Sequence, residues 1–77
     1  MEKANKILNE LLYANNIAID SFYNVTITRW EISFQARFSS DLMAKLRESF
    51  GVDFKLSDDM VKAEFKRAEL LIKIVLT

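Results

Sequence analysis

Residues 25–34 read VTITRWEISF, and the alternation of apolar side chains changes phase in the middle of this stretch. Val25 and Ile27 occupy odd positions, whereas Ile32 and Phe34 occupy even ones. In an antiparallel hairpin with an even-length loop, directly paired residues share a face and their numbers sum to an odd value. The phase change therefore predicts a hairpin that pairs Ile27 with Ile32. A single strand with a bulge is the alternative interpretation.

A second phase change lies between Phe65 and Leu70. Pairing these two residues by the same rule leaves the four-residue loop Lys66-Arg67-Ala68-Glu69. Loops of this length are usually built on a type I turn and need no glycine. Both hairpin loops have the form x-Arg-x-Glu, and an offset of 38 (67 − 29 and 69 − 31) aligns them. A tandem αββ duplication is therefore an open hypothesis.

Two other segments have the spacing of amphipathic helices. Apolar side chains at positions 4, 7, 8, 11 and 12 predict a helix over about residues 2–15, which Asn15 and Asn16 would end. The second helix would begin after Ser39, whose hydroxyl is a good N-terminal cap, and would end at Gly51. Gly51 is the only glycine of the chain, and it suits the positive φ that a C-terminal cap requires.

These patterns together predict an α+β fold that forms a single domain over residues 1–77. Ile17, Ile19 and Tyr23 continue the odd-numbered apolar face of Val25 and Ile27, which predicts extended chain before the first hairpin. The remaining apolar run, at residues 52–56, would add a short strand. We expect an antiparallel sheet of four or five strands with both helices on one face. The order of elements along the chain would be α-β-β-α-β-β-β.

The composition excludes several chemistries. The chain has no cysteine and no histidine, so it lacks disulfides, the usual base-activated nucleophiles and the usual transition-metal ligands. A single glycine cannot form a glycine-rich phosphate loop. Asp58 and Asp59 are adjacent, but after Ser57 they are typical of a turn. We therefore expect no enzyme activity, no cofactor and no metal site.

Charge and hydropathy indicate a chain of the cell interior. Eleven basic and eleven acidic residues cancel, so no overall field attracts nucleic acid or a membrane surface. No apolar run approaches the roughly 20 residues of a membrane span. The N-terminal residues lack the apolar stretch of a signal peptide, and the absence of cysteine is compatible with a reducing compartment. We expect a cytoplasmic location.

The sheet face turned away from the helices would carry an excess of basic residues. These are Arg37, Lys55, Lys62, Lys66 and Lys73, set against the acids Asp53 and Glu64. Such a face can track phosphates, which makes nucleic-acid binding an alternative function. Single-strand binders usually add aromatic side chains for base stacking, and only Phe22 is placed to serve. We prefer the interpretation that this face is in contact with solvent and that its lysines also protect the sheet edges from pairing with other chains.

The last strand, ELLIKIVLT, has apolar side chains on both faces. Leu71 and Val75 fall on the face opposite the helices, and a strand of this kind is usually central or covered. The first hairpin loop holds a second group of candidate binding residues: Arg29, Trp30 and Glu31. Tryptophan and arginine are enriched at binding hot spots. An indole that folds back over the end of the core is the other interpretation of Trp30.

The sequence resembles no family with motifs specific enough to name. Its features favour a non-catalytic protein-binding module: an adaptor, a subunit or an inhibitor that occludes a partner's surface. Small, chemistry-poor chains of this kind are typical of inhibitors carried by viruses and mobile elements. The partner-binding residues would be Arg29, Trp30, Glu31, Leu71 and Val75. Nucleic-acid binding through the basic face and a structural homo-oligomer, for example a homodimer, are the alternatives.

Overall fold

The chain combines two α-helices, one short 3-10 helix and five strands in a computed structural model that describes residues 2–77. In chain order they are α1 (Glu2–Tyr13), η1 (Ile19–Ser21), β1 (Asn24–Ile27), β2 (Glu31–Ala36), α2 (Ser40–Phe50), β3 (Lys55–Ser57), β4 (Met60–Arg67) and β5 (Leu70–Leu76). The α+β class is confirmed. The order differs from the expected one by η1, where period-two spacing had suggested extended chain.

The sheet is mixed, so the expectation of a purely antiparallel sheet is wrong. Its strand order is β1-β2-β5-β4-β3, and β2 and β5 run parallel, with Glu31 beside Leu71 and Ala36 beside Leu76. The other neighbouring pairs are antiparallel. The parallel pair arises because β5 takes the central position of the sheet, after a connection from β2 that runs through α2, β3 and β4. Its apolar side chains on both faces suit that position.

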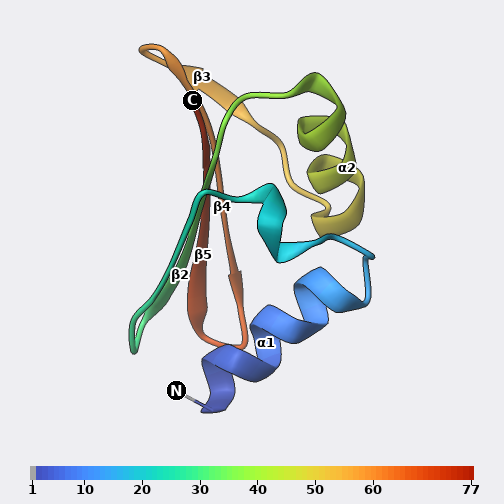
Figure 1. Cartoon of the computed structure of the whole chain (residues 1–77). Coiled ribbons are helices and arrows are strands. Elements are labelled where there is room, and N and C mark those ends of the chain that lie inside the picture. Colours follow the sequence, from blue (N-terminus) through green and yellow to red (C-terminus); the bar gives the residue numbers. More distant parts are fainter. Residues whose placement is uncertain (1) are drawn as a thin grey trace.

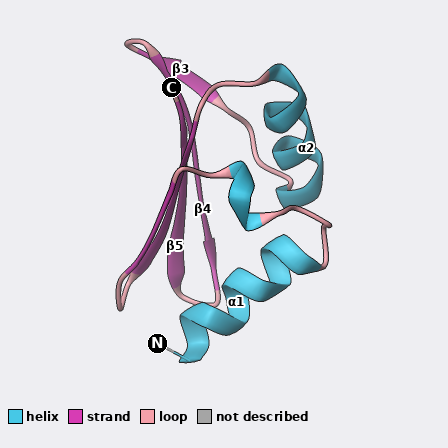
Figure 2. Cartoon of the chain, in the orientation of Figure 1, coloured by secondary structure: helices cyan, strands magenta, loops and turns pink. Residues whose placement is uncertain are grey.

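Both helices cover the same face of the sheet (Figures 1 and 2). The core lies between these layers, where Phe34, Ile32, Ile72, Ile74 and Leu76 of β2 and β5 have no exposed surface. Neither helix crosses to the opposite face (Figure 1). The central strands therefore bury one side of the sheet and leave the other uncovered.

Four phenylalanines link the layers through the middle of the core. The ring centroids of Phe22 and Phe34 are 4.9 Å apart, and those of Phe34 and Phe50 are 6.4 Å apart. Phe65 on β4 continues the series, 5.9 Å from Phe50. All three pairs are tilted, a geometry that aromatic rings favour over face-to-face stacking. Phe34 makes two of the three contacts.

The helix ends follow the capping residues in the sequence. Ser39 caps α2, because its hydroxyl accepts a hydrogen bond from the Leu42 backbone N–H at 3.3 Å. Gly51 ends the helix in the left-handed region, with φ of 65°. After α1, Asn16 has a φ of 57°, and the backbone N–H of Ile17 donates to the Leu12 carbonyl at 2.8 Å. That bond and positive φ are typical of a Schellman motif.

The segment between α1 and β1 differs from the expected strand. Residues 17, 19 and 23 alternate in the sequence, yet only Ile17 is buried. Ile19 lies in η1 with 53% of its surface exposed, and Tyr23 is 61% exposed. Phe22 enters the core between them, at 7% exposure. Alternation alone did not reveal that this segment turns through a 3-10 helix.

The first hairpin has the expected register, and the second does not. Ile27 pairs with Ile32, as expected. In the second hairpin Phe65 pairs with Ile72 instead of Leu70, and Arg67 pairs with Leu70. The loop is therefore the two residues 68 and 69, and the register shifts by two positions without changing the face of any side chain. The shorter loop extends the ladder between β4 and β5 to the pair of Arg67 with Leu70.

The two residues of this tight turn have unfavourable backbone conformations. Ala68 and Glu69 have φ angles of 51° and 72°, the left-handed values that a type I′ turn requires and that L-residues avoid. Asn-Gly is the preferred sequence there. We expect the double variant Ala68→Asn, Glu69→Gly to raise the free energy of unfolding by about 1 kcal/mol in a urea titration. The variant also loses the ion pair between Glu69 and Lys3. That pair is 3.6 Å long and exposed, so its loss offsets little of the gain in stability.

The matched control is Trp30→Gly in the first hairpin loop, where φ is not positive. Glycine there only adds freedom to the unfolded chain, so stability should fall. A loss of stability in the double variant would show that the turn carries no strain.

The sheet topology contradicts a tandem αββ duplication. With β2 and β5 pointing the same way, β1 lies on one side of β2, whereas β4 lies on the opposite side of β5. Both helices nevertheless cover the same face (Figure 1). The two hairpins therefore have opposite hands relative to the helices, and no rotation superimposes one half on the other. The shared x-Arg-x-Glu pattern does not reflect a repeated unit.

Candidate functional site

The uncovered side of the sheet presents three strands whose residues form cross-strand rows. We call it the outer face: Glu31, Ser33 and Gln35 of β2, Leu71, Lys73 and Val75 of β5, and Lys62, Glu64 and Lys66 of β4. One row contains Glu31, Leu71 and Lys66. A second contains Gln35, Val75 and Lys62. The middle row places Lys73 between Ser33 and Glu64.

The two apolar residues of this face lie on its central strand. Leu71 and Val75 are partly exposed, and Lys73 stands between them along β5. Polar and charged neighbours on β2 and β4 shield part of each side chain, as the stems of lysines commonly do. Each apolar group is therefore framed by polar groups, which is the arrangement of a small interface core with a polar rim.

The structure brings most of the expected basic residues to one side of the sheet. Lys62, Lys66 and Lys73 share the outer face on two adjacent strands. Lys55 on the edge strand β3 pairs with Lys62 and lies on the same side, whereas Arg37 follows the end of β2. The outer face holds three lysines against two glutamates, and Lys55 adds to this basic excess.

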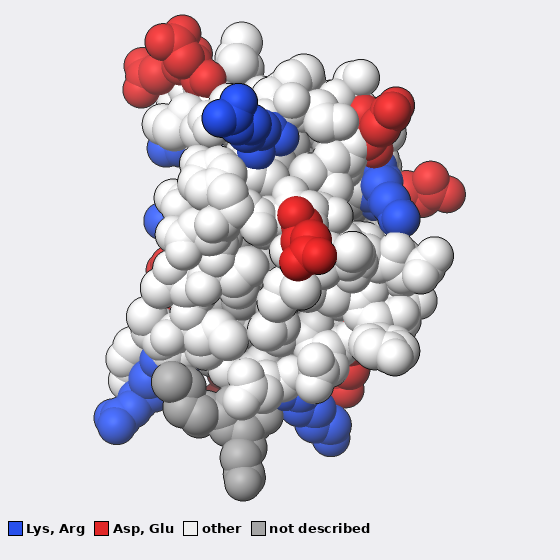
Figure 3. All heavy atoms as spheres, viewed as in Figure 1, with Lys and Arg blue, Asp and Glu red and all other residues white. Residues whose placement is uncertain are grey.

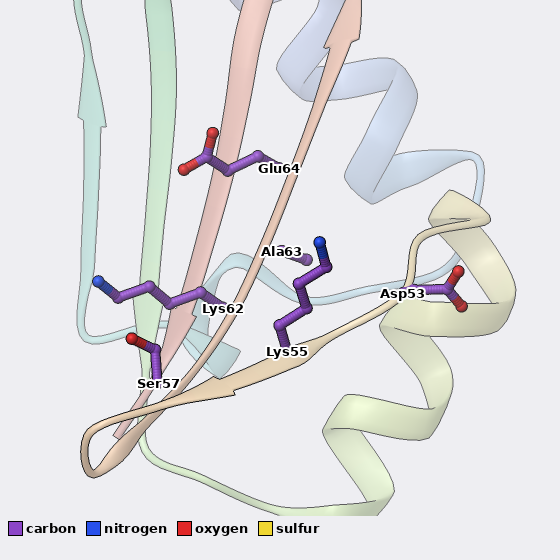
Figure 4. Close-up of a pocket in the computed structure, with 6 residues that line it drawn as sticks. All are labelled: Asp53, Lys55, Ser57, Lys62, Ala63 and Glu64. Carbon is purple, nitrogen blue, oxygen red and sulfur yellow. The ribbon is translucent and has the colours of Figure 1, made fainter.

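Beside this face, a shallow depression of about 350 Å³ lies between β3 and β4 (Figure 4). Figure 4 shows Lys62 and Glu64 pointing away from the helices, whereas Lys55 extends along the gap between the strands. Asp53, on the connection from α2, points toward the opposite side. The depression therefore gathers charges of both signs without converging them on one point, and it is a poor site for a single ion.

The tip of the first hairpin is held by backbone hydrogen bonds. The Thr28 hydroxyl accepts from the backbone N–H groups of Trp30 and Glu31, at 3.3 and 3.1 Å. The Trp30 carbonyl accepts from the Leu71 backbone N–H at 2.9 Å, which connects the tip to β5. The Trp30 side chain is 72% exposed. The indole therefore does not close the core, and the interpretation of Trp30 as a core cap is wrong.

A further hollow, of about 450 Å³, is one that the sequence did not reveal. It is lined by Tyr23, Arg37 and Thr77. The Tyr23 and Thr77 hydroxyl oxygens are 3.4 Å apart. The three residues come from distant parts of the chain and meet only because β5 ends beside β2. The alternation pattern had instead placed Tyr23 against the core.

Within residues 2–77, no three His, Cys, Asp or Glu side chains form a group that could hold a metal ion. No helix in the same part of the chain is long and apolar enough to cross a membrane. No family model, curated protein sequence or solved structure matches the chain.

Proposed function

We propose that this chain is a non-catalytic protein-binding module that docks through its outer face and the adjoining hairpin tip. The observation that carries the proposal is the position of Leu71 and Val75 on the central strand of a sheet face that no helix covers. A strand that is apolar on both faces is usually covered on both, and no helix covers this side of β5. Contact of Leu71 and Val75 with another surface removes them from water and supplies binding free energy.

The hairpin tip extends this surface. Trp30 lies at the end of the sheet where its carbonyl meets the Leu71 backbone, so the exposed indole and the first apolar row are neighbours along the ladder. Three hydrogen bonds to this short loop fix the backbone that carries the indole. An anchor whose backbone is fixed before binding loses little conformational entropy on docking.

The charges of the outer face favour an acidic partner surface. Lys62, Lys66 and Lys73 outnumber Glu31 and Glu64, and two copies placed face to face would bring like charges together. A partner with an apolar centre and an acidic rim complements both features. We therefore propose a protein of different sequence as the ligand of this face, with occlusion of the partner's surface as the mechanism.

The test is affinity capture from the native host with the tagged chain, in three forms. We expect the wild type to retain one predominant protein, and the double variant Leu71→Thr, Val75→Thr to lose it. Threonine has the β-branched shape that strands favour, so the fold should persist. The control is Leu56→Thr on β3, which removes an equally apolar residue that is 79% exposed but lies off the outer face. Equal loss with the control variant would show non-specific adhesion and contradict the proposal.

Nucleic-acid binding is the second candidate, favoured by the three lysines on β4 and β5. It predicts that nuclease treatment abolishes capture and that Lys62→Gln with Lys73→Gln abolishes direct binding to single-stranded oligonucleotides. Binding driven by phosphate contacts should also weaken steeply as salt is raised. Capture that survives nuclease and depends on Leu71 and Val75 separates the protein-binding function from this alternative.

A further inference from the structure

The two edges of the sheet differ in how they are protected from pairing with another chain. At one edge β3 has only three residues, and β4 beyond it carries Glu64, Lys66 and Arg67. Short edge strands and charged side chains discourage further pairing. The other edge is β1, whose sequence Asn-Val-Thr-Ile has no charge and no proline. Figure 4 shows β1 as the outermost strand on its side, with no strand beyond it.

The hydrogen-bonding phase of β1 shows which backbone groups are free at this edge. The Thr28 backbone N–H donates to the Glu31 carbonyl at 2.9 Å, so that pair belongs to the hydrogen-bonded set of the hairpin. Antiparallel ladders alternate, which turns Thr26 toward β2 and turns the N–H and C=O groups of Val25 and Ile27 toward the open edge. Two donors and two acceptors therefore face outward.

One antiparallel register lets a second copy satisfy all four groups. It pairs Thr26 with Thr26 of the second copy, and Val25 with Ile27 of the second copy. The apolar side chains then meet on the helix side, where both are already half-buried, and the threonines meet on the outer face. A register centred on Val25 fails, because it requires Tyr23, whose N–H already donates to the Gln35 carbonyl at 2.9 Å.

We propose that two copies of this chain pair along β1 about a two-fold axis at Thr26, and so join their five-stranded sheets into one. The register is self-complementary in hydrogen bonds, in the face of each side chain and in charge. A second copy therefore fits this edge without the like-charge contacts that oppose pairing through the outer face.

Surface next to β1 supplies the area that a four-residue strand pair lacks. Stable interfaces bury more than about 1,000 Å² in total, which a pair this short does not reach alone. Ile19 and Tyr23 precede β1 and are 53% and 61% exposed. The segment from η1 to β1 crosses the front of the view in Figure 1, and Figure 3 shows that this side of the molecule is largely uncharged, with most acidic and basic groups at its margins. In the proposed register the numbers of opposed residues sum to 52, so Tyr23 lies beside Arg29 of the second copy. The exposed surface before β1 in one copy therefore packs along the first hairpin of the other.

Cysteine cross-linking tests the register directly, because the chain contains no cysteine of its own. Thr26 and its counterpart form a non-hydrogen-bonded pair, for which the Cα separation is about 4.5 Å and within the range of disulfides. We expect Thr26→Cys to form a covalent dimer of two 9.0-kDa chains under mild oxidation. The control Ser57→Cys, exposed on the opposite edge, should remain mostly monomeric. Equal cross-linking at both positions would overturn the proposal.

Charge exchange at the same position tests the dimer without a covalent bond. The mass in solution, measured by light scattering, should fall from twice 9.0 kDa to 9.0 kDa in Thr26→Lys and in Thr26→Glu. Mixing the two variants should restore the dimer, which also shows that both are folded. A wild type that remains at 9.0 kDa at every concentration, or a dimer that Thr26→Lys leaves intact, would overturn the proposal. Cross-linking and light scattering use the chain alone, so their results can be told apart from capture of a different protein through Leu71 and Val75.

Discussion

Replacement of Phe34 by alanine is expected to lower the free energy of unfolding by about 3–5 kcal/mol, as truncation of a buried phenylalanine does. Phe34 has no exposed surface, and its ring lies between those of Phe22 and Phe50. The substitution leaves a cavity where β2, α2 and the segment after η1 meet, and these three cannot all move inward to fill it.

The size of the chain makes this effect decisive. At 0.05–0.15 kcal/mol per residue, a chain of 77 residues has a total stability of about 4–12 kcal/mol. The loss therefore removes a large part of the total. A thermal melt followed by circular dichroism should show Tm lower by about 12 °C or more.

The control is Phe38→Ala, which makes the same truncation four residues later. Phe38 is 50% exposed, and its backbone N–H bond to the Thr77 carbonyl does not depend on the side chain. We expect a loss below about 1 kcal/mol, the usual range for surface positions. Similar losses at both positions would mean that the aromatic series through Phe34 does not hold the layers together.

Local patterns in the sequence predicted the local parts of this fold. The phase change between Ile27 and Ile32 gave the first hairpin its correct register, since a register shift by one residue would turn its apolar face toward water. Ser39 and Gly51 marked the ends of α2, because each supplies a group or a backbone conformation that a helix end requires. In these cases the physical cause lies within a few residues of its effect.

The parts that sequence reasoning missed depend on distant segments or on unusual residues. The parallel pairing of β2 with β5 joins segments about 40 residues apart, and alternation within a strand carries no information about its neighbour. The apolar groups on both faces of β5 indicated a central strand, but not which strand lies beside it. The two-residue turn was missed because Ala68 and Glu69 lack the Asn-Gly signature of a type I′ turn.

Alternation also predicted part of the candidate site. It placed Lys62, Lys66 and Lys73 on one face, because it counts residues within continuous strands. It placed Lys55 on the same side, and the pairing of Lys55 with Lys62 agrees with this. It did not predict that Arg37, which follows the last residue of β2, lines a hollow with Tyr23 and Thr77, because that hollow joins three distant segments.

Replacement of Trp30 by alanine is expected to weaken partner binding by at least about 2 kcal/mol, or roughly 30-fold in Kd, while the stability of the chain changes by less than about 0.5 kcal/mol. The indole is 72% exposed, so its removal leaves no cavity. The hydrogen bonds that shape the loop come from backbone groups and from Thr28, and they persist in the variant. Thermal melts and titration with the captured partner measure the two quantities.

The control for Trp30→Ala is Tyr13→Ala, an aromatic residue on α1 that is 88% exposed and lies apart from the outer face. Its loss should change neither the stability nor the affinity for the partner.

Because Trp30 is the only tryptophan, fluorescence gives an independent check. The free chain should emit at long wavelength and be quenched readily by iodide, and partner binding should shift the emission to shorter wavelength. A blue-shifted indole that iodide does not quench in the free chain, together with a stability loss near 3–5 kcal/mol, would instead make Trp30 part of the core. In that case the binding surface would be confined to Leu71, Val75 and the charged rows around them.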